Sequence, residues 1–315
     1  MKIEVFFNTK NEAATGERFV EDINCCDVEG KITRKEKKFI AQLCGDEECV
    51  IAMLRLIWEI SFLYEGYFYS PDRYWVNGSL KNVNDLYFLS YYKSGKIWRG
   101  SSLCLATEKM DYSKELILKY KKMRNTGRES GVLYKTLINS FFYLHSEAYD
   151  GINVNHRLSL LLNACDGIGI NFKGQNNNVG ANIANTIRDT LDANLVKYGA
   201  SLLGIPKSKV FDALKAERDE IDHYIAKKGS LSDYLTNRTD IKSDYVNWYF
   251  VFVLELAIRL SLLEEIGGGC SDICKVTAIQ EINDWIILGC DMDEECKNPQ
   301  NVMKQKFQKQ GVFIR

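Results

Sequence analysis

The sequence predicts an α+β protein, with a β-rich N-terminal domain followed by an all-α helical bundle. In residues 1–108, short runs of alternating hydrophobic residues are separated by turn signals, of which Asn77-Gly78 is the strongest. Beyond about residue 110, turn dipeptides thin out and apolar residues recur at helical spacing. A chain of 315 residues is long enough for two domains. We therefore assign residues 1–108 to the β-rich domain and residues 109–315 to the helical one.

Strands and one helix are expected in the first domain. The helix follows Gly45, with Asp46 as its N-cap, because apolar residues then recur at helical spacing. These residues are Val50, Met53, Leu54, Ile57, Trp58 and Phe62. The strand-like runs are KIEVFF, RFVEDIN, KKFIAQLC, RYWVNG, DLYFLSYY and KIWRGSSLCLAT.

The second domain is expected to be a helical bundle. Pro206 suits the first turn of a helix and Gly229 suits a helix C-terminus. The segment 172–178, FKGQNNN, is a polar loop, and Gly267 begins a glycine run that ends a long helix. Helices are predicted near 112–123, 131–149, 154–168, 179–203, 206–228, 241–265 and 272–283.

Composition narrows the classes of function. Hydrophobic residues make up 46% and charged residues 26% of the chain, as in an ordinary globular protein. The net charge of -1 argues against a protein that coats duplex nucleic acid, which normally needs a large basic excess. The strongest basic cluster, KYKKMRNTGR at 119–128, is expected to be a solvated helix end, with contact to an RNA backbone as the alternative.

Cysteine usage predicts reduced thiols and no metal or other cofactor. The ten cysteines are scattered, which is unlike a small disulfide-stapled scaffold and is typical of a cytoplasmic protein. A zinc site could be sought at Cys270, Cys274, Cys290 and Cys296. Their spacing differs from the usual two-residue knuckles, and no histidine lies among them.

Neither a signal peptide nor a membrane span is predicted. The first residues, MKIEVFFNTKNE, contain no apolar run of the required length. The most apolar segment, YFVFVLELAIRLSLL, is interrupted by Glu255 and Arg259. We therefore expect a cytoplasmic protein that has no contact with a membrane.

The candidate site lies in KAERDEIDHYIAKKG, residues 215–229. Arg218 and Asp219 precede His223 on one predicted helix, so the three side chains can border one cleft. The chain has only three histidines, and one of them stands here among charged residues. A second, His156, could reach the same cleft from the helix predicted at 154–168, although a structural role is the commoner fate of such a residue.

The simpler alternative is a solvated helix face. Arg218 with Asp222, and Lys215 with Asp219, have the spacing of ordinary (i, i+4) ion pairs. Spacing alone favours this interpretation over a functional site.

The chemical interpretation is cleavage of an RNA phosphodiester by its own 2′-hydroxyl group. This reaction needs a group that exchanges protons near neutral pH, which suits His223. It also needs a cation for the charge that grows on the phosphoryl oxygens, which suits Arg218. A position near the helix C-terminus, with Asp219 and Asp222 nearby, favours the protonated imidazole that would act as general acid.

These residues carry a resemblance to a family. Residues 218–223, RDEIDH, match the motif of HEPN-domain ribonucleases, an arginine and a polar residue followed after three positions by histidine. NVNHRLSLLLNACDGIGIN looks like the first bundle helix of the Apea-like HEPN group, and DYVNWYFVFVLELAIRLSLLEEIG resembles its closing helix. GDEECVIAMLRLIWEISFLYEGYF is similar to the β-rich N-terminal domain attached to such modules. The resemblance covers most of the chain.

The resemblance implies a metal-independent endoribonuclease in a bacterial antiphage-defence, abortive-infection or toxin system. His223 would be the general acid or base, Arg218 would bind the phosphate, and Asp219 would orient them. It implies an RNA substrate, and an antitoxin or sensor protein is a further expected partner. A homodimer is expected because one chain offers too few catalytic groups, whereas two copies facing across a two-fold axis would form a composite cleft.

Asp219 departs from the family pattern, which usually has asparagine after the arginine. An asparagine amide can donate to a phosphate oxygen, whereas an aspartate repels it. The departure supports a second hypothesis, a catalytically silent HEPN-like module that binds a protein partner or a nucleotide. A toxin-neutralising partner is a third.

Overall fold

The computed structural model describes residues 1–8, 19–35, 38–66, 70–86, 112–125, 154–173, 179–223, 226–235 and 243–290. These residues form an antiparallel sheet with helices, followed by a helical region, which confirms the predicted α+β class. The chain divides into two compact units. The first holds Met1–Lys96, Ser102–Gly151 and Leu262–Cys270, and the second holds Ile97–Ser101, Ile152–Ser261 and Ser271–Arg315.

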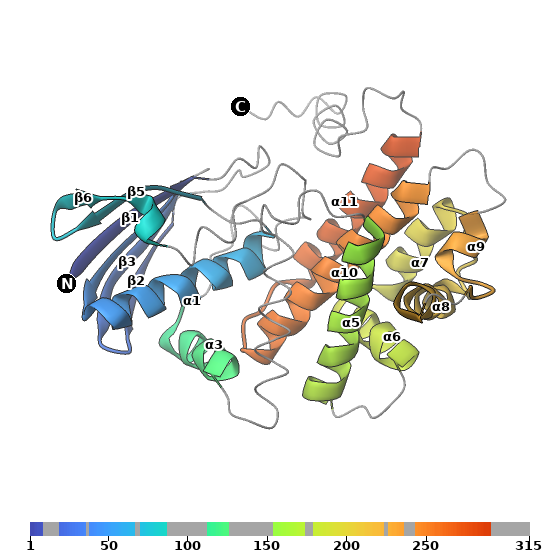
Figure 1. Cartoon of the computed structure of the whole chain (residues 1–315), viewed down its shortest axis with the longest axis horizontal. Helices are drawn as coiled ribbons and strands as arrows, with labels where there is room; N and C mark the ends of the chain where they lie inside the picture. The colour runs from blue at the N-terminus through green and yellow to red at the C-terminus, as the bar shows by residue number, and fades with distance from the viewer. Residues whose placement is uncertain are drawn as a thin grey trace. The chain divides into compact units, whose positions relative to one another are not determined.

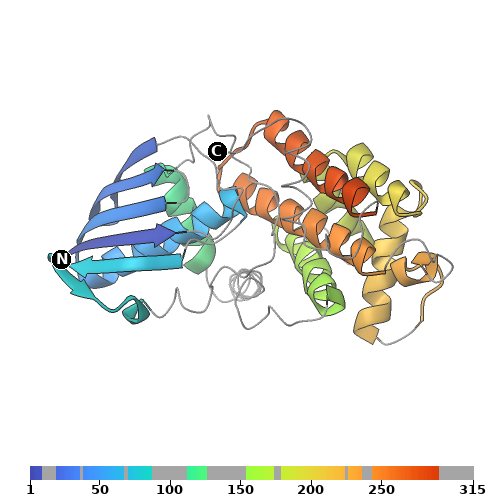
Figure 2. The ribbon, with the colours of Figure 1, turned by 90° about the horizontal axis from the view of Figure 1, so that it is seen from above.

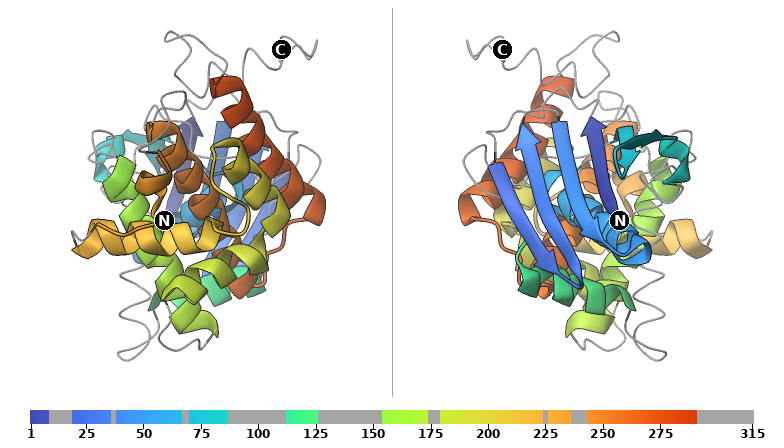
Figure 3. Two further views of the ribbon diagram at one scale, coloured as in Figure 1. Left: turned by 90° about the vertical axis from the view of Figure 1, so that its right-hand side faces the viewer. Right: turned by 90° about the vertical axis from the view of Figure 1, so that its left-hand side faces the viewer.

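The first unit is built on a six-stranded antiparallel sheet with the order β2-β3-β4-β1-β5-β6. Figure 3 shows the strands side by side in its right-hand view. Alternate residues of the central strand, such as Val5 and Phe7, are buried, as the hydrophobic alternation requires. The strands are β1 Lys2–Asn8, β2 Phe19–Cys25, β3 Val28–Lys35, β4 Lys38–Gly45, β5 Ser70–Val76 and β6 Ser79–Lys81.

Two tight turns set the register of the hairpins. Asn77 and Gly78 have φ values of 49° and 82° and join β5 to β6, which confirms the predicted turn. Cys26 and Asp27, with φ values of 53° and 61°, join β2 to β3 in the same way. The sequence did not predict β3, because VEGKITRK is rich in charge and its turn contains no glycine.

Helices α1 (Glu47–Glu65) and α3 (Lys114–Asn125) lie on the same side of the sheet in Figure 1. Asp46 has the extended backbone of an N-cap, but its side chain makes no capping hydrogen bond, which corrects that part of the prediction. Gly66 ends α1 in the left-handed conformation, with φ 75°. The buried carboxylate of Glu65 lies 2.6 Å from Arg34 of β3 and so ties the helix to the sheet.

Glu59 lies at the centre of a buried polar cluster between α1 and α3. Its carboxylate accepts hydrogen bonds from Arg55 Nε at 3.0 Å and Tyr120 Oη at 2.8 Å, and also from the guanidinium of Arg124. Burial and the neighbouring carboxylate of Glu59 raise the pKa of Tyr120, so its hydroxyl keeps the proton that it donates. Both lone-pair directions of the fully buried Glu59 are therefore used.

The second unit packs its helices around α10 (Ser243–Glu265), as Figures 1 and 2 show. Among the described residues, Val246–Glu265 is the one segment long and apolar enough to cross a membrane, and 94% of its most apolar window is buried inside the protein. This burial is that of a core helix. The other helices are α5 Val154–Lys173, α6 Val179–Thr190, α7 Ala193–Leu202, α8 Val210–His223, α9 Leu231–Leu235 and α11 Asp272–Cys290.

Two helix predictions in this unit are corrected. The single helix expected at 179–203 is divided into α6 and α7, because the carboxylate of Asp192 accepts hydrogen bonds from the backbone N–H groups of Asn194 and Leu195 and starts a new helix. Of the helix expected at 206–228, only Val210–His223 is helical among the described residues, since residues 206–209 and 226–229 are not in a helix. Gly229, with φ 83°, lies in the turn before α9 rather than at the end of α8.

Several predictions fall outside the described residues. They are the helix at 131–149, the strand at 96–107, most of DLYFLSYY and the domain limit at residue 108. The limits 1–108 and 109–315 therefore stay a prediction. Helix α3, which follows residue 108 in sequence, groups with the sheet in the first unit.

Removing the carboxylate at the centre of the α1–α3 cluster should strongly destabilise the first unit. Glu59→Ala removes the carboxylate that pairs with the buried guanidinium of Arg124, and breaking a buried pair in this way costs about 3–5 kcal/mol. Urea-induced unfolding followed by circular dichroism measures the loss. Glu115→Ala is the control, because it removes an exposed partner of Lys119 and should cost at most about 1 kcal/mol. Equal losses in the two variants would contradict the assignment.

Candidate functional site

Helix α8, which carries the candidate residues, is amphipathic. Val210, Ala213 and Leu214 are buried, whereas the residues from Arg218 to His223 are half-buried or exposed. The helix packs against α5, α6 and α9. The candidate residues therefore lie on the C-terminal half of a helix whose other half belongs to the core.

The guanidinium of Arg218 is held on three sides. Its Nε lies 3.1 Å from Asp222 Oδ2 and donates to Asn163 Oδ1 of α5 at 3.2 Å. Its Nη1 donates to Asp219 Oδ1 at 3.3 Å. Nη2 makes no hydrogen bond or ion pair with the described residues. The side chain is 18% exposed, so the group is oriented and one amino group is left for an external acceptor.

Asp222 is the main orienting residue of the site. Its carboxylate accepts hydrogen bonds from Ser159 Oγ and from Asn163 Nδ2 at 3.1 Å, in addition to its contact with Arg218. Among the described residues, Asp219 makes one hydrogen-bonding contact, with Arg218. Sequence reasoning assigned the orienting role to Asp219 and missed Ser159 and Asn163. A usable signal was the pair of polar residues four positions apart in the leucine-rich run LSLLLN.

His223 lies at the end of α8 and is exposed. No hydrogen bond or ion pair joins it to Arg218, Asp219 or any other described residue. Within one chain, the structure therefore brings Arg218 and Asp219 together and leaves His223 one and a half turns farther along the same helix.

The interpretation of this side of α8 as an ordinary solvated helix face is only partly right. The predicted ion pair between Arg218 and Asp222 forms, but no ion pair within 4.0 Å joins Lys215 to Asp219 in this part of α8. Asp219 and Asp222 are only 24% and 19% exposed, and contacts with Asn163 tie this face to α5. A freely solvated face makes no such contacts.

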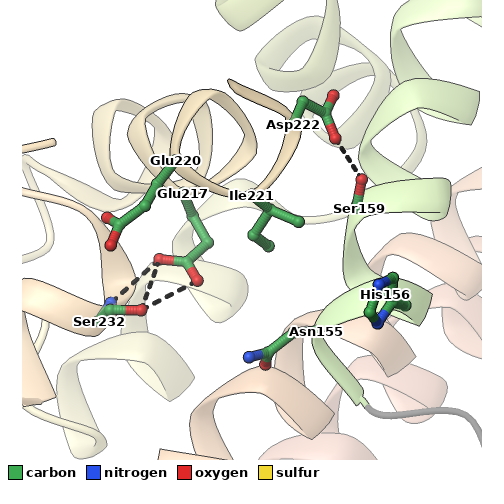
Figure 4. A pocket seen from close by; sticks show the side chains of 8 residues that line it. All are labelled: Asn155, His156, Ser159, Glu217, Glu220, Ile221, Asp222 and Ser232. Atoms are coloured by element: carbon green, nitrogen blue, oxygen red, sulfur yellow. Dashed lines mark hydrogen bonds between the residues drawn. The ribbon is translucent and has the colours of Figure 1, made fainter. Parts of the chain in front are cut away.

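A pocket of about 500 Å³ lies beside these residues, between α5, α8 and α9. Neither Arg218 nor His223 lines it, whereas His156 does. Figure 4 shows Asp222 bonded to Ser159 on one side of the pocket and a carboxylate bonded to Ser232 on the other. The lining residues are Asn155, His156, Ser159, Glu217, Glu220, Ile221, Asp222 and Ser232. Its wall is therefore acidic.

Glu217 is the buried carboxylate of this wall. It is 1% exposed, and burial raises the pKa of its carboxyl above the ordinary value of 4.5. Hydrogen bonds from the backbone N–H and the hydroxyl of Ser232 act in the opposite direction, because they stabilise the ionised form. Burial is the larger effect.

The described residues contain no group of three or more histidine, cysteine, aspartate or glutamate side chains placed to hold a metal ion. Cys270 and Cys274 are free thiols, and Cys296 lies outside the described residues. Helix α8 itself contributes a guanidinium, an imidazole and carboxylates.

No protein-family model, curated protein or solved structure matches this chain. The resemblance to HEPN-domain ribonucleases therefore stays a prediction from the residues 218–223 and the helices around them.

The pKa of Glu217 should lie above 4.5 and should rise further in Ser232→Ala. That substitution removes a hydroxyl that stabilises the ionised carboxylate but keeps the backbone N–H donor. Carboxyl-¹³C NMR titration of both proteins measures the values. A wild-type value at or below 4.5, or a lower value in the variant, would contradict the proposed environment.

The same shift sets a pH dependence of stability. The pKa of Glu217 is higher in the folded state than in the unfolded state. The contribution of this carboxyl to stability is therefore fully present below about pH 4.5 and is lost as the pH rises through the folded-state pKa. The free energy of unfolding of wild type, relative to Glu217→Gln, should therefore fall as the pH rises through this window. A difference in unfolding free energy between wild type and Glu217→Gln that does not vary with pH would contradict the raised pKa.

Proposed function

We propose that the chain is a metal-independent endoribonuclease of the HEPN type, acting in the cytoplasm in a bacterial defence or toxin system. The observation that carries the proposal is the state of Arg218, whose guanidinium is oriented by Asp222 and Asn163 while Nη2 stays unengaged among the described residues. An exposed His223 follows on the same helix. Cleavage by the 2′-hydroxyl requires a fixed cation for the charge that grows on the phosphoryl oxygens and an imidazole that exchanges protons with the reacting oxygens.

In the proposed reaction, the ribose 2′-oxygen attacks the adjacent phosphorus and the bond to the 5′-oxygen breaks. One imidazole removes the proton of the 2′-hydroxyl, and a second gives a proton to the leaving 5′-oxygen. Arg218 donates from Nη2 to a phosphoryl oxygen, where negative charge grows. Two imidazoles are present when two copies of His223 face one another, which is why the proposal includes a homodimer.

Arg218→Ala and His223→Ala should each lower the rate of RNA cleavage by about 10²–10⁴-fold, the usual contribution of a positioned acid, base or charge. Single-turnover cleavage of labelled single-stranded RNA measures the effect. Lys228→Ala removes an exposed cation outside α8 and is the matched control, with an unchanged rate expected. Because Arg218 also joins α8 to α5, thermal unfolding of each variant shows whether the fold is retained. Unchanged rates in both variants would rule out the assigned roles.

The products should carry 2′,3′-cyclic phosphate ends and should form in excess chelator, because the mechanism routes no step through a metal ion. End analysis of the cleaved RNA is the readout. Strict dependence on a divalent metal ion, or 3′-hydroxyl ends, would overturn the proposal.

Asp219→Asn should preserve or raise the rate of RNA cleavage, because it removes a negative charge beside the phosphate site.

A composite site also predicts that an inactive subunit silences an active one. Mixing wild type with His223→Ala under conditions of subunit exchange should lower the activity to about the square of the fraction of wild-type chains, because a mixed dimer holds one imidazole where two are needed. Light scattering reports the mass of the active species. Activity from a monomer at micromolar concentration, or activity that falls only in proportion to the added variant, would reject the composite site.

The acidic pocket favours a second candidate function, a catalytically silent module that binds a protein partner. Glu217, Glu220 and Asp222 would repel a phosphate and would suit a lysine or arginine side chain of the partner. Glu220→Gln separates the two functions, since it should weaken capture of such a partner and should leave RNA cleavage intact or improve it.

A further inference from the structure

Besides the buried Arg157, which lies 5.9 Å from the ring centre of Trp248, three cations on α6, on α7 and just before α8 rest on aromatic rings. The guanidinium of Arg188, on α6, lies 4.6 Å from the ring centre of Phe211, and Nζ of Lys197, on α7, lies 5.7 Å from the same ring. Nζ of Lys207, between α7 and α8, lies 5.5 Å from the ring centre of Tyr198. We refer to Arg188, Lys197, Tyr198, Lys207 and Phe211 as the basic–aromatic patch. Arg188 and Lys197 share the ring of Phe211 because a π-face attracts positive charge, and Lys207 lies against Tyr198, which follows Lys197 in sequence.

The positive charge of the patch is not neutralised by ion pairs. Among the described residues, no carboxylate forms an ion pair with Arg188, Lys197 or Lys207, whereas neighbouring Lys209 lies 3.6 Å from Asp212. Another carboxylate of this region, that of Asp192, is engaged by backbone N–H groups at the start of α7. The patch is therefore a local excess of positive charge on a chain whose net charge is -1.

The patch also offers an exposed ring. Tyr198 is 43% exposed, and Nζ of Lys207 lies against its ring. A cation beside an exposed aromatic ring suits a ligand that has both phosphates and bases. The cation can bind a phosphate, and a base can stack on the ring.

The patch continues toward the candidate site along α8. Phe211, Lys215 and Arg218 follow at intervals of four and three residues, so they lie on one side of the helix. Phe211 and Arg218 are separated by about 10 Å along the helix axis. A strand that places a phosphate on Arg218 can therefore run past Lys215 onto the patch.

We propose that the basic–aromatic patch binds single-stranded RNA, with Arg188, Lys197 and Lys207 on phosphates and Tyr198 under a base. The choice of RNA rests on the proposed function, since the patch would hold the part of the substrate beyond the cleaved bond. An acidic protein segment would use the same cations but would gain nothing from an open ring.

The test is binding of a fluorescein-labelled 2′-O-methyl oligouridine of about 16 nucleotides, the upper range of a single-strand site. The triple variant Arg188→Ala/Lys197→Ala/Lys207→Ala should bind at least about tenfold more weakly. Its slope of log K against log salt should be shallower by about 2, because each lost phosphate contact on a single strand removes about 0.7. Tyr198→Ala should weaken binding by about tenfold with little change in that slope.

The matched control is Arg73→Ala/Lys209→Ala/Lys275→Ala, which removes the same charge from cations that face carboxylates. It should bind as wild type does. The variant Arg188→Lys/Lys197→Arg/Lys207→Arg keeps the charge and should retain the salt slope. Fluorescence anisotropy gives the affinities, and circular dichroism melts verify that each protein is folded.

The proposal is overturned if wild type does not bind the oligonucleotide, if the patch variant binds as wild type does, or if the control variant loses as much affinity. Because a 2′-O-methyl strand has no attacking hydroxyl, binding is measured independently of cleavage. A wild-type protein that binds this strand at the patch but never cleaves unmodified RNA would reject the proposed nuclease and leave the binding surface in place.

Discussion

The fold of the second unit depends on how the ionised side chains inside its core are paired. Helix α10 is buried along most of its length, yet it carries Glu255 and Arg259. An ionised group in such a place is tolerated only with a partner of opposite charge, because losing its hydration costs several kcal/mol. Arg157 of α5 supplies that partner, with Nη1 3.8 Å from Glu255 and both side chains 2% exposed. This ion pair places Arg157 on the side of α5 that faces α10.

The candidate site follows from that constraint. With Arg157 directed at α10, the opposite side of α5 presents Ser159 and Asn163, which bind Asp222. Asp222 and Asn163 in turn hold Arg218. The guanidinium is thus positioned by a chain of contacts that begins in the core. The same contacts surround it with carboxylates, so a phosphate would have to compete with Asp222 and a homodimer would have to supply the missing positive charge.

Local patterns in the sequence were enough for most strands of the sheet other than β3 and for most helices, because alternation in KIEVFF and the turn at Asn77-Gly78 specify structure within a few residues. The break at Asp192 was missed, since a carboxylate that starts a helix is hard to distinguish from one on its surface. The positions of Arg218, Asp219 and His223 on α8 were predictable from spacing. The roles of Ser159 and Asn163 were not, because contacts between α5 and α8 join residues more than fifty positions apart in the chain.

The central claim is that Arg218 binds the phosphate that is cleaved. A crystal structure with a 2′-O-methyl dinucleotide, which cannot be cut, tests it most directly. The account predicts a phosphate oxygen within hydrogen-bonding distance of Arg218 Nη2, and a nitrogen of His223 from either chain near the 5′-oxygen. A dinucleotide bound with its phosphate away from Arg218, while Arg218 keeps all its contacts with Asp219, Asp222 and Asn163, would contradict it.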